Sequence, residues 1–253
     1  IDQCHHFACA HAFVQHRSGD HNLHLHRPLG DGVVAGHGML DGRRIVCFAQ
    51  DYSIFEGTMG EMHAKKIAKI AEFAEKSQLP IIGIWDGDGQ RAYEGVPALG
   101  ATGELLDILV ACSGRIPIIS LVLGTVSGVS ALAAGLSDFV ILGSEHGQMF
   151  MRSPYFIPEV INGEIDEDTL GGAESHASRS GVACLVAEDE HDAINIAAEI
   201  LSYLPDHTLA ESFNVNSGDP WDRTCKKLEK IVPSDSNKPY DMSKVIKEVV
   251  DED

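Results

Sequence analysis

Apolar runs of strand length alternate with helical patterns along most of this chain. Two strands over 33–39 and 44–49 flank Asp41-Gly42, a dipeptide typical of hairpin turns. Beyond them, short apolar runs alternate with segments whose apolar residues recur at helical spacing. The further strands expected are 80–86, 116–123 and 138–143, and the helices are 61–77, about 98–113, one from Gly128, 189–204 and 242–250.

The helix expected over 61–77 has an apolar face for packing and a polar face for solvent. Its apolar face is Ile67, Ile70, Ala71 and Ala74, and its lysines are Lys65, Lys66 and Lys69. Strands and helices that alternate at such short spacing are typical of α/β proteins with mainly parallel strands. The fold class predicted from the pattern alone is therefore α/β.

Three regions differ in composition, and we expect each to have its own role. Residues 1–31 indicate a polar N-terminal arm rich in histidine, residues 32–205 a core, and residues 206–253 an arm and helix that pack on a partner. A zinc site in the first region is the minor alternative to an exposed arm, and its spacing fits no established zinc pattern. It would use Cys4, His5, Cys9 and His11. We therefore expect no metal in this chain.

The composition is that of a globular chain with a strong acidic bias. Of 253 residues, 44% are apolar, and 38 acidic residues against 19 basic ones give a net charge of −19. A field of this sign argues against nucleic acid and anionic membranes as partners, although solubility or a saline host explains it equally well. Scattered cysteines, no secretory signal and no membrane-length apolar run favour a cytoplasmic protein with reduced thiols.

Two of the expected strands each lead into a glycine turn, and each turn resembles the N-terminus of a helix. The first turn follows residues 80–86, and the second follows residues 116–123. Helix N-termini present unpaired backbone N–H groups, and two such turns side by side can hold one oxyanion. The candidate donors are the amides of Gly89, Gln90, Gly128 and Val129. The alternative is that these glycines only permit tight turns.

Six segments in the same order give the chain a resemblance to a known family. They are Phe13-Val14-Gln15-His16-Arg17, residues 41–67, DGDGQRAYEG at 86–95, GTVSGVSAL at 124–132, residues 170–183 and residues 233–253. The chain resembles the N-terminal half of the carboxyltransferase subunit of biotin-dependent acyl-CoA carboxylases, of the propionyl-CoA carboxylase β type. The resemblance implies a crotonase-like fold, which is a spiral of strand–strand–helix units.

The resemblance also implies a reaction. A carboxyl group would pass from carboxybiotin to the α-carbon of an acyl-CoA, through an enolate held by the backbone amides of the two turns. A malonyl-type thioester decarboxylase uses the same enolate and is the nearest alternative. A non-catalytic structural subunit of a carboxylase complex is the alternative outside the enzymes.

Partners follow from the same resemblance. Family members continue into a second, related half, so we expect that half or a separate subunit to complete the site. Biotin would be carried by a partner, and biotin carboxyl carrier protein and biotin carboxylase are the expected further components. The chain is expected in a homo- or hetero-oligomer.

Several side chains are candidates for contacts with CoA phosphates or for a base. Lys65, Lys66 and Arg91 could meet the phosphates, although a solvated lysine and a structural arginine are the plainer interpretations. His176 titrates near neutral pH and is a candidate base, with a structural role as the favoured alternative. Glu94 is a second candidate base.

The two turns depart from the family pattern. The family has Asp-Ser-Gly-Gly-Ala-Arg at the first turn and Gly-Pro-x-Ala-Gly-Gly-Ala at the second. Asp88 stands where the family has glycine, Gln90 where it has alanine, and Val129 where it has a second glycine. A carboxylate beside a developing enolate opposes its formation. We therefore expect Asp88 to point away from the thioester and to pair with Arg91.

Overall fold

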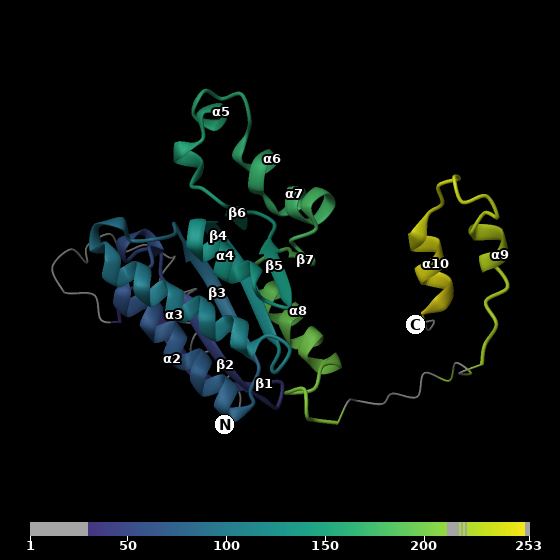
Figure 1. The fold of residues 1–253 in the computed structure, drawn as a ribbon, viewed down its shortest axis with the longest axis horizontal. Coiled ribbons are helices and arrows are strands. Elements are labelled where there is room, and N and C mark those ends of the chain that lie inside the picture. The colour runs from purple at the N-terminus through teal and green to yellow at the C-terminus, as the bar shows by residue number, and fades with distance from the viewer. Residues whose placement is uncertain (1–29, 212–217, 219, 221, 251–253) are drawn as a thin grey trace. The chain divides into compact units, whose positions relative to one another are not determined.

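The computed structural model describes residues 30–211, 218, 220 and 222–250. A seven-stranded sheet forms the centre of the part up to Glu211, with strand order β1-β2-β3-β4-β5-β7 and with β6 paired to β4 (Figure 1). Only the hairpin β1–β2 is antiparallel, so the expected α/β fold with mainly parallel strands is confirmed. The strands are β1 Val33–Leu40, β2 Arg43–Gln50, β3 Ile81–Gly87, β4 Ile118–Ser127, β5 Phe139–Gly143, β6 Gln148–Phe150 and β7 Leu185–Ala187.

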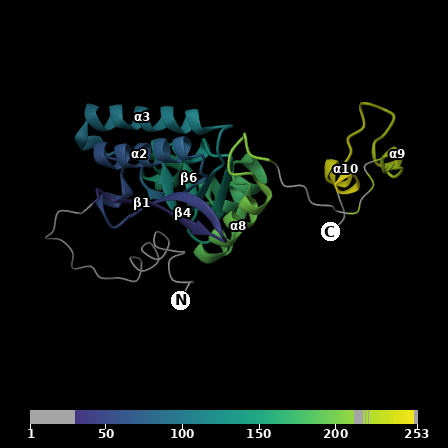
Figure 2. The same ribbon diagram turned by 90° about the horizontal axis from the view of Figure 1, so that it is seen from below.

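Helices cover both faces of the sheet. Figure 2 shows α2 and α3 on one side of it and α8 on the other, with α2 between α3 and the sheet. Every residue of β3 is buried, because both of its faces are covered in this way. The helices are α2 Glu61–Ser77, α3 Val96–Cys112, α4 Gly128–Gly135, α5 Pro158–Ile161, α6 Glu167–Gly171, α7 Ala173–Ser175 and α8 Glu190–Tyr203.

Helix α2 has the bounds that its periodicity predicts. Ile67, Ala71 and Ala74 are fully buried against the sheet and α3, and Ile70 is partly buried. The helix ends where Gln78 takes a left-handed conformation with φ 55°, and its amide then bonds the carbonyl oxygens of Ala74 and Glu75. Helix α2 follows the loop that contains Met59, and this loop contacts the first glycine turn at Gly89.

Two expectations about the turns need correction. Strand β4 does not stop at residue 123 but continues to Ser127, because Thr125, Val126 and Ser127 pair with β6. The first turn is not the N-terminus of a helix, because a 3₁₀ turn at Ala92–Glu94 separates it from α3. The second turn does begin a helix, α4, at Gly128 as expected. The sequence analysis also missed β6, β7 and the short helices α5 to α7, each of five residues or fewer.

The chain divides into two compact units after Glu211, a few residues beyond the boundary expected at 205/206. In the second unit, helices α9 Leu228–Ile231 and α10 Met242–Val249 contain no buried residue. Arg223 links this unit internally, since its guanidinium donates to the carbonyl oxygens of Glu248 and Val249. The expected arm over 1–31, with Cys4, His5, Cys9 and His11, lies outside the described residues except at its end. Among the described residues, no helix is both long and apolar enough to cross a membrane.

Candidate functional site

The two glycine turns lie side by side, as the sequence predicts. Strands β3 and β4 are parallel neighbours whose last paired residues are Gly87 and Val126. Beyond them, Gly89 has φ 73° and Gly128 has φ 54°, both in the left-handed region that favours glycine. A Cβ atom added to Gly128 would lie 3.9 Å from the Cα of Gly89, and one added to Gly89 would lie 3.1 Å from the carbonyl oxygen of Ser127, so the two turns lie close together.

Backbone amides at these turns remain available as donors. The first turn of α4 has no intrahelical partner for its N–H groups, and its N-cap residue Ser127 makes no side-chain cap. Within residues 30–211, the amides of Gly89 and Gln90 donate no hydrogen bond. Both turns therefore carry unused backbone donors, which an oxyanion site requires.

The loop before α2 holds the first turn in position. The Met59 amide donates to the carbonyl oxygen of Gly89 at 2.7 Å, and the Arg91 amide donates to the carbonyl oxygen of Met59 at 3.0 Å. Phe55 and Glu56 in this loop have φ of 53° and 56°, a conformation that costs energy for residues other than glycine. The hydrogen bonds to the turn compensate for part of that cost.

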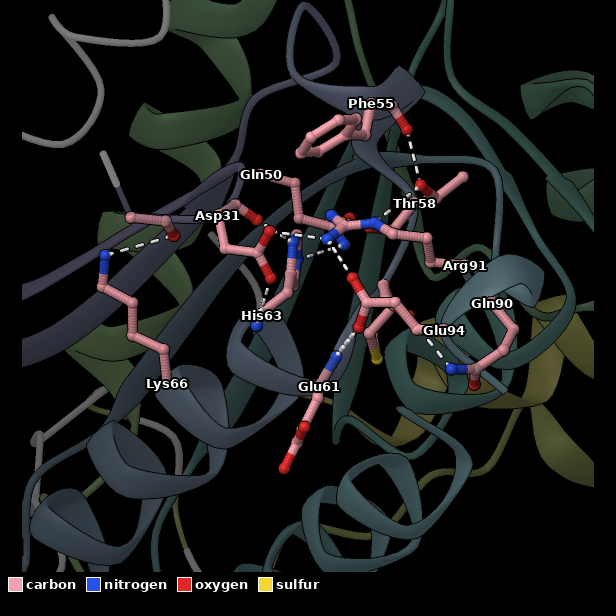
Figure 3. Close-up of polar contacts among 12 residues, drawn as sticks. Asp31, Gln50, Phe55, Thr58, Glu61, His63, Lys66, Gln90, Arg91 and Glu94 are labelled. Atoms are coloured by element: carbon pink, nitrogen blue, oxygen red, sulfur yellow. Dashed lines mark hydrogen bonds and ion pairs between the residues drawn. The ribbon is translucent and has the colours of Figure 1, made fainter. Parts of the chain in front are cut away.

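Arg91 is a buried structural residue in this site (Figure 3). Its side chain is only 1% exposed, and its guanidinium contacts the carboxylates of Asp31 and Glu94 and the carbonyl oxygen of Thr58. Burial alone would lower the pKa of Arg91, but the hydrogen bonds to the two carboxylates outweigh it and raise that pKa. The geometry thus fits the structural alternative for Arg91 and not a contact with CoA phosphates.

The same two carboxylates cap the N-terminus of α2. Glu94 accepts from the Glu61 amide at 2.7 Å, and Asp31 accepts from the His63 amide at 2.9 Å. Burial opposes ionisation of Glu94, but the Glu61 amide and Arg91 prevail and lower its pKa. A carboxylate engaged in this way is a poor base, which weighs against Glu94 in that role. The sequence analysis missed Asp31, because its partner Arg91 is 60 residues away.

His63 is the buried centre behind this cap. Its Nδ1 donates to the carbonyl oxygen of Asp31 at 2.9 Å, and its Nε2 accepts from the Gln50 side-chain amide at 3.1 Å. This tautomer follows from the partners, because a carbonyl oxygen can only accept. Burial lowers the pKa of His63 to about 4, although the hydrogen bond that His63 donates to the Asp31 carbonyl oxygen opposes this shift. The imidazole is therefore neutral at physiological pH.

The expected pairing of Asp88 with Arg91 is wrong. The Asp88 carboxylate instead accepts from the hydroxyl of Ser127 at 2.5 Å, a bond that links the first turn to the residue before Gly128. Gln90 ties the first turn to its surroundings, since its side chain donates to the carbonyl oxygen of Met59 and accepts from Thr102 of α3. The two departures in the first turn thus have defined partners.

The remaining candidates also have partners. Lys65 forms an ion pair with Glu61 at 2.6 Å, and Lys66 donates to the carbonyl oxygen of Val33 at 2.7 Å. His176 contacts the carbonyl oxygen of Met149 and the hydroxyl of Ser180, which fits the structural interpretation of this histidine. Within the part of the chain that the structure describes, no group of three His, Cys, Asp or Glu side chains could hold a metal.

A hollow of about 370 Å³ lies beside the first turn. Its wall includes Phe55, whose ring lies 4.5 Å from the Arg91 guanidinium carbon, and Tyr93, which is 74% exposed. An exposed aromatic ring next to a cavity can stack on a planar ligand group such as a nucleobase. The other lining residues are Glu56, Thr58, Gln90, Arg91 and Ala92.

Comparison with known proteins gives one consistent family. The carboxyl transferase domain profile matches residues 2–253. The chain is 38% identical over 249 residues to the biotin-dependent acetyl-/propionyl-coenzyme A carboxylase beta5 subunit of Mycobacterium tuberculosis, covering 96% of this chain and 45% of that protein. It is 38% identical over 239 residues to the methylmalonyl-CoA decarboxylase subunit alpha of Veillonella parvula, covering 94% and 47%.

The fold matches a solved structure of the same kind. Transcarboxylase 12S, solved as a hexamer with hydrolysed methylmalonyl-coenzyme A bound, superposes with a TM-score of 0.73 at 34% identity. The match covers 87% of this chain and 43% of that one, and it confirms the expected crotonase-like fold. The chain spans about half the length of the curated relatives it matches.

Proposed function

The chain belongs to the carboxyl transferase domain family, and from this membership we propose that it is the acyl-CoA-binding half of a biotin-dependent carboxyltransferase. The acyl-CoA bound to this chain would form an enolate, and its α-carbon would then accept the carboxyl group. The observation that carries the proposal is the close approach of the turns at Gly89 and Gly128, each of which has unused backbone N–H groups.

These amides would act on the thioester oxygen. As the α-proton leaves, negative charge grows on that oxygen, and fixed N–H donors stabilise it more than they stabilise the neutral thioester. Removal of one such donor costs about 3 kcal/mol in comparable sites. The candidates remain Gly89, Gln90, Gly128 and Val129, with the side chains of Gln90 and Arg91 holding the first turn in shape.

Biotin would be supplied by a partner, and carboxybiotin would provide the carboxyl group. The partner would be a second carboxyltransferase half or subunit, in a complex with biotin carboxyl carrier protein and biotin carboxylase. The observation that supports this is that the relatives are named as subunits of such enzymes. For CoA, Lys65 and Lys66 at the start of α2 are the candidate phosphate contacts, each released from its present partner on binding.

A decarboxylase is the second candidate. The α subunit of methylmalonyl-CoA decarboxylase is 38% identical to this chain, at the same level as the carboxylase subunit. Loss of CO₂ from a malonyl-type thioester leaves the same enolate, so one site serves both directions. A purely architectural subunit would need neither the free amides nor a hollow beside them.

The test uses the carboxyltransferase assembly that contains this chain, prepared without its biotin carrier protein, with methylmalonyl-CoA or malonyl-CoA and free biocytin. A carboxyltransferase removes the carboxyl group at a rate that depends on biocytin. A direct decarboxylase removes it at the same rate without biocytin. Absence of both reactions, together with no binding of acyl-CoA by calorimetry, would refute the enzymatic proposals and leave the structural one.

The donors can be tested one at a time. Proline at position 128 would remove an N–H, but φ of 54° is incompatible with a proline ring, so that variant would also break the turn. Replacing the Val129 amide by an ester removes the N–H and leaves the side chains intact. We expect kcat to fall by about a hundredfold with a smaller change in KM. The control is an ester at Ala131, because the Ala131 N–H can bond a carbonyl oxygen within the helix and is not a candidate donor.

A further inference from the structure

We propose that Asp88 and Ser127 are a pair of positioning residues, in which each side chain keeps the other away from the amide donors of α4. The hydrogen bond between them joins the two turns at the point where the β3–β4 ladder ends. The consequence for catalysis rests on the proposed function, whereas the pairing itself does not.

The ladder places the two residues opposite each other. Gly87 and Val126 are the last backbone pair of β3 and β4. The next residues are Asp88 and Ser127, and their side chains continue the connection with a 2.5 Å bond from hydroxyl to carboxylate. Bonds of this length between a hydroxyl and an ionised carboxylate are among the stronger hydrogen bonds in proteins.

Ser127 occupies the N-cap of α4 but does not cap it. Serine is a preferred N-cap residue, because its oxygen accepts from the amide two or three residues later. Here those amides belong to Val129 and Ser130, yet no side-chain cap forms. Ser127 is buried, with 3% of its surface exposed, and its hydroxyl donates to Asp88. A hydroxyl that donates can still accept, so its position keeps it off the Val129 amide, and the bond to Asp88 holds the oxygen where no cap forms.

The relation also holds in the other direction. A carboxylate beside the N-terminus of a helix is attracted to the unpaired amides there. Without Ser127 as a donor, the Asp88 carboxylate is free to accept from the first turn of α4. Each single substitution thus leaves one acceptor able to occupy the donors, whereas removing both side chains leaves none. The family pattern, with glycine and alanine at these two positions, has neither acceptor.

The test is a cycle of four proteins, assayed in the assembled enzyme: the natural chain, Asp88→Gly, Ser127→Ala and the double variant. We expect each single variant to lose about tenfold or more in kcat with a smaller change in KM. The double variant should recover most of the natural kcat. If the double variant loses about the product of the two single losses, the residues act independently and the proposal is wrong.

A second measurement does not depend on activity. The rate of amide hydrogen exchange over residues 127–134 should fall in both single variants, because an acceptor then occupies an α4 amide. In the double variant, the rate should return to that of the natural chain. Equal exchange in all four proteins would overturn the pairing, whatever the activity. If exchange follows this pattern and no protein turns over acyl-CoA, the proposed function fails and the pairing stands. Ser144→Ala, which removes an exposed hydroxyl bonded to the carbonyl oxygen of Glu188, is the control.

Discussion

The backbones of Gly57 and Gly87 pack directly against each other, where the loop before α2 contacts the end of β3. A Cβ atom on Gly87 would stand 2.2 Å from the carbonyl oxygen of Gly57, and a Cβ atom on Gly57 would stand 2.1 Å from that of Asp86. An added methyl group could not be accommodated by a change of side-chain rotamer, because the opposing atoms belong to the backbone. This contact brings the loop close enough for Met59 to bond the first turn.

We predict that Gly57→Ala destabilises the protein by about 3 kcal/mol or more, from a steric clash added to the strain of a positive φ. The matched control is Gly42→Ala, because Gly42 also has a positive φ, 80°, but no atom within 4 Å of an added Cβ. It should cost about 1 kcal/mol. Urea unfolding measures both values, and equal losses would show that the contact between the two glycines contributes nothing.

Arg91→Ala should be destabilising in proportion to its burial. The substitution leaves the carboxylates of Asp31 and Glu94 close together and without their shared cation. Breaking a buried ion pair in this way costs about 3 kcal/mol. Arg115→Ala, which removes a 63% exposed side chain paired with Glu75, should cost less than about 1 kcal/mol. Loss of acyl-CoA affinity in Arg91→Ala at unchanged stability would instead restore the phosphate role.

His63 should make the protein sensitive to acid. Its pKa is about 4 when folded and 6.5 in the reference state, so between these values the unfolded chain binds a proton that the folded chain does not. Stability therefore rises with pH across this window, is complete above pH 6.5, and falls on acidification by about 3 kcal/mol from this group. His63→Asn should lack that part of the slope. The control is His146→Asn, because His146 is largely exposed; an unchanged slope in His63→Asn would reject the assignment.

The apposition of the two turns was predictable because adjacent parallel strands end at the same edge of a sheet. The bounds of α2 were predictable for a similar reason, since its apolar period is regular and continuous. In both cases the information is local or follows from topology. The three-residue strands β6 and β7 carry no period that the sequence can reveal.

The partner of Asp88 was not predictable, because it depends on strand register. Trp85 pairs with Val122, and that register continued would place Thr125 opposite Asp88. A shift between Trp85 and Gly87 moves Ser127 into that place instead. The partners of Arg91 were not predictable for a related reason, since a hydrogen bond to Asp31, 60 residues away, produces no pattern in the local sequence.

Helix α10 carries an exposed apolar face that would serve association. Along this helix, Met242, Ile246 and Val249 recur at helical spacing and are each more than half exposed. Alone, such a face is costly in water, and we propose that it packs on a partner, as the composition of residues 206–253 leads us to expect. Ile246→Lys should therefore lower the assembly mass in sedimentation while leaving unfolding of the first unit unchanged. Ser243→Lys introduces the same charge off this face and should leave assembly intact; equal loss in both variants would point to charge and not to the apolar face.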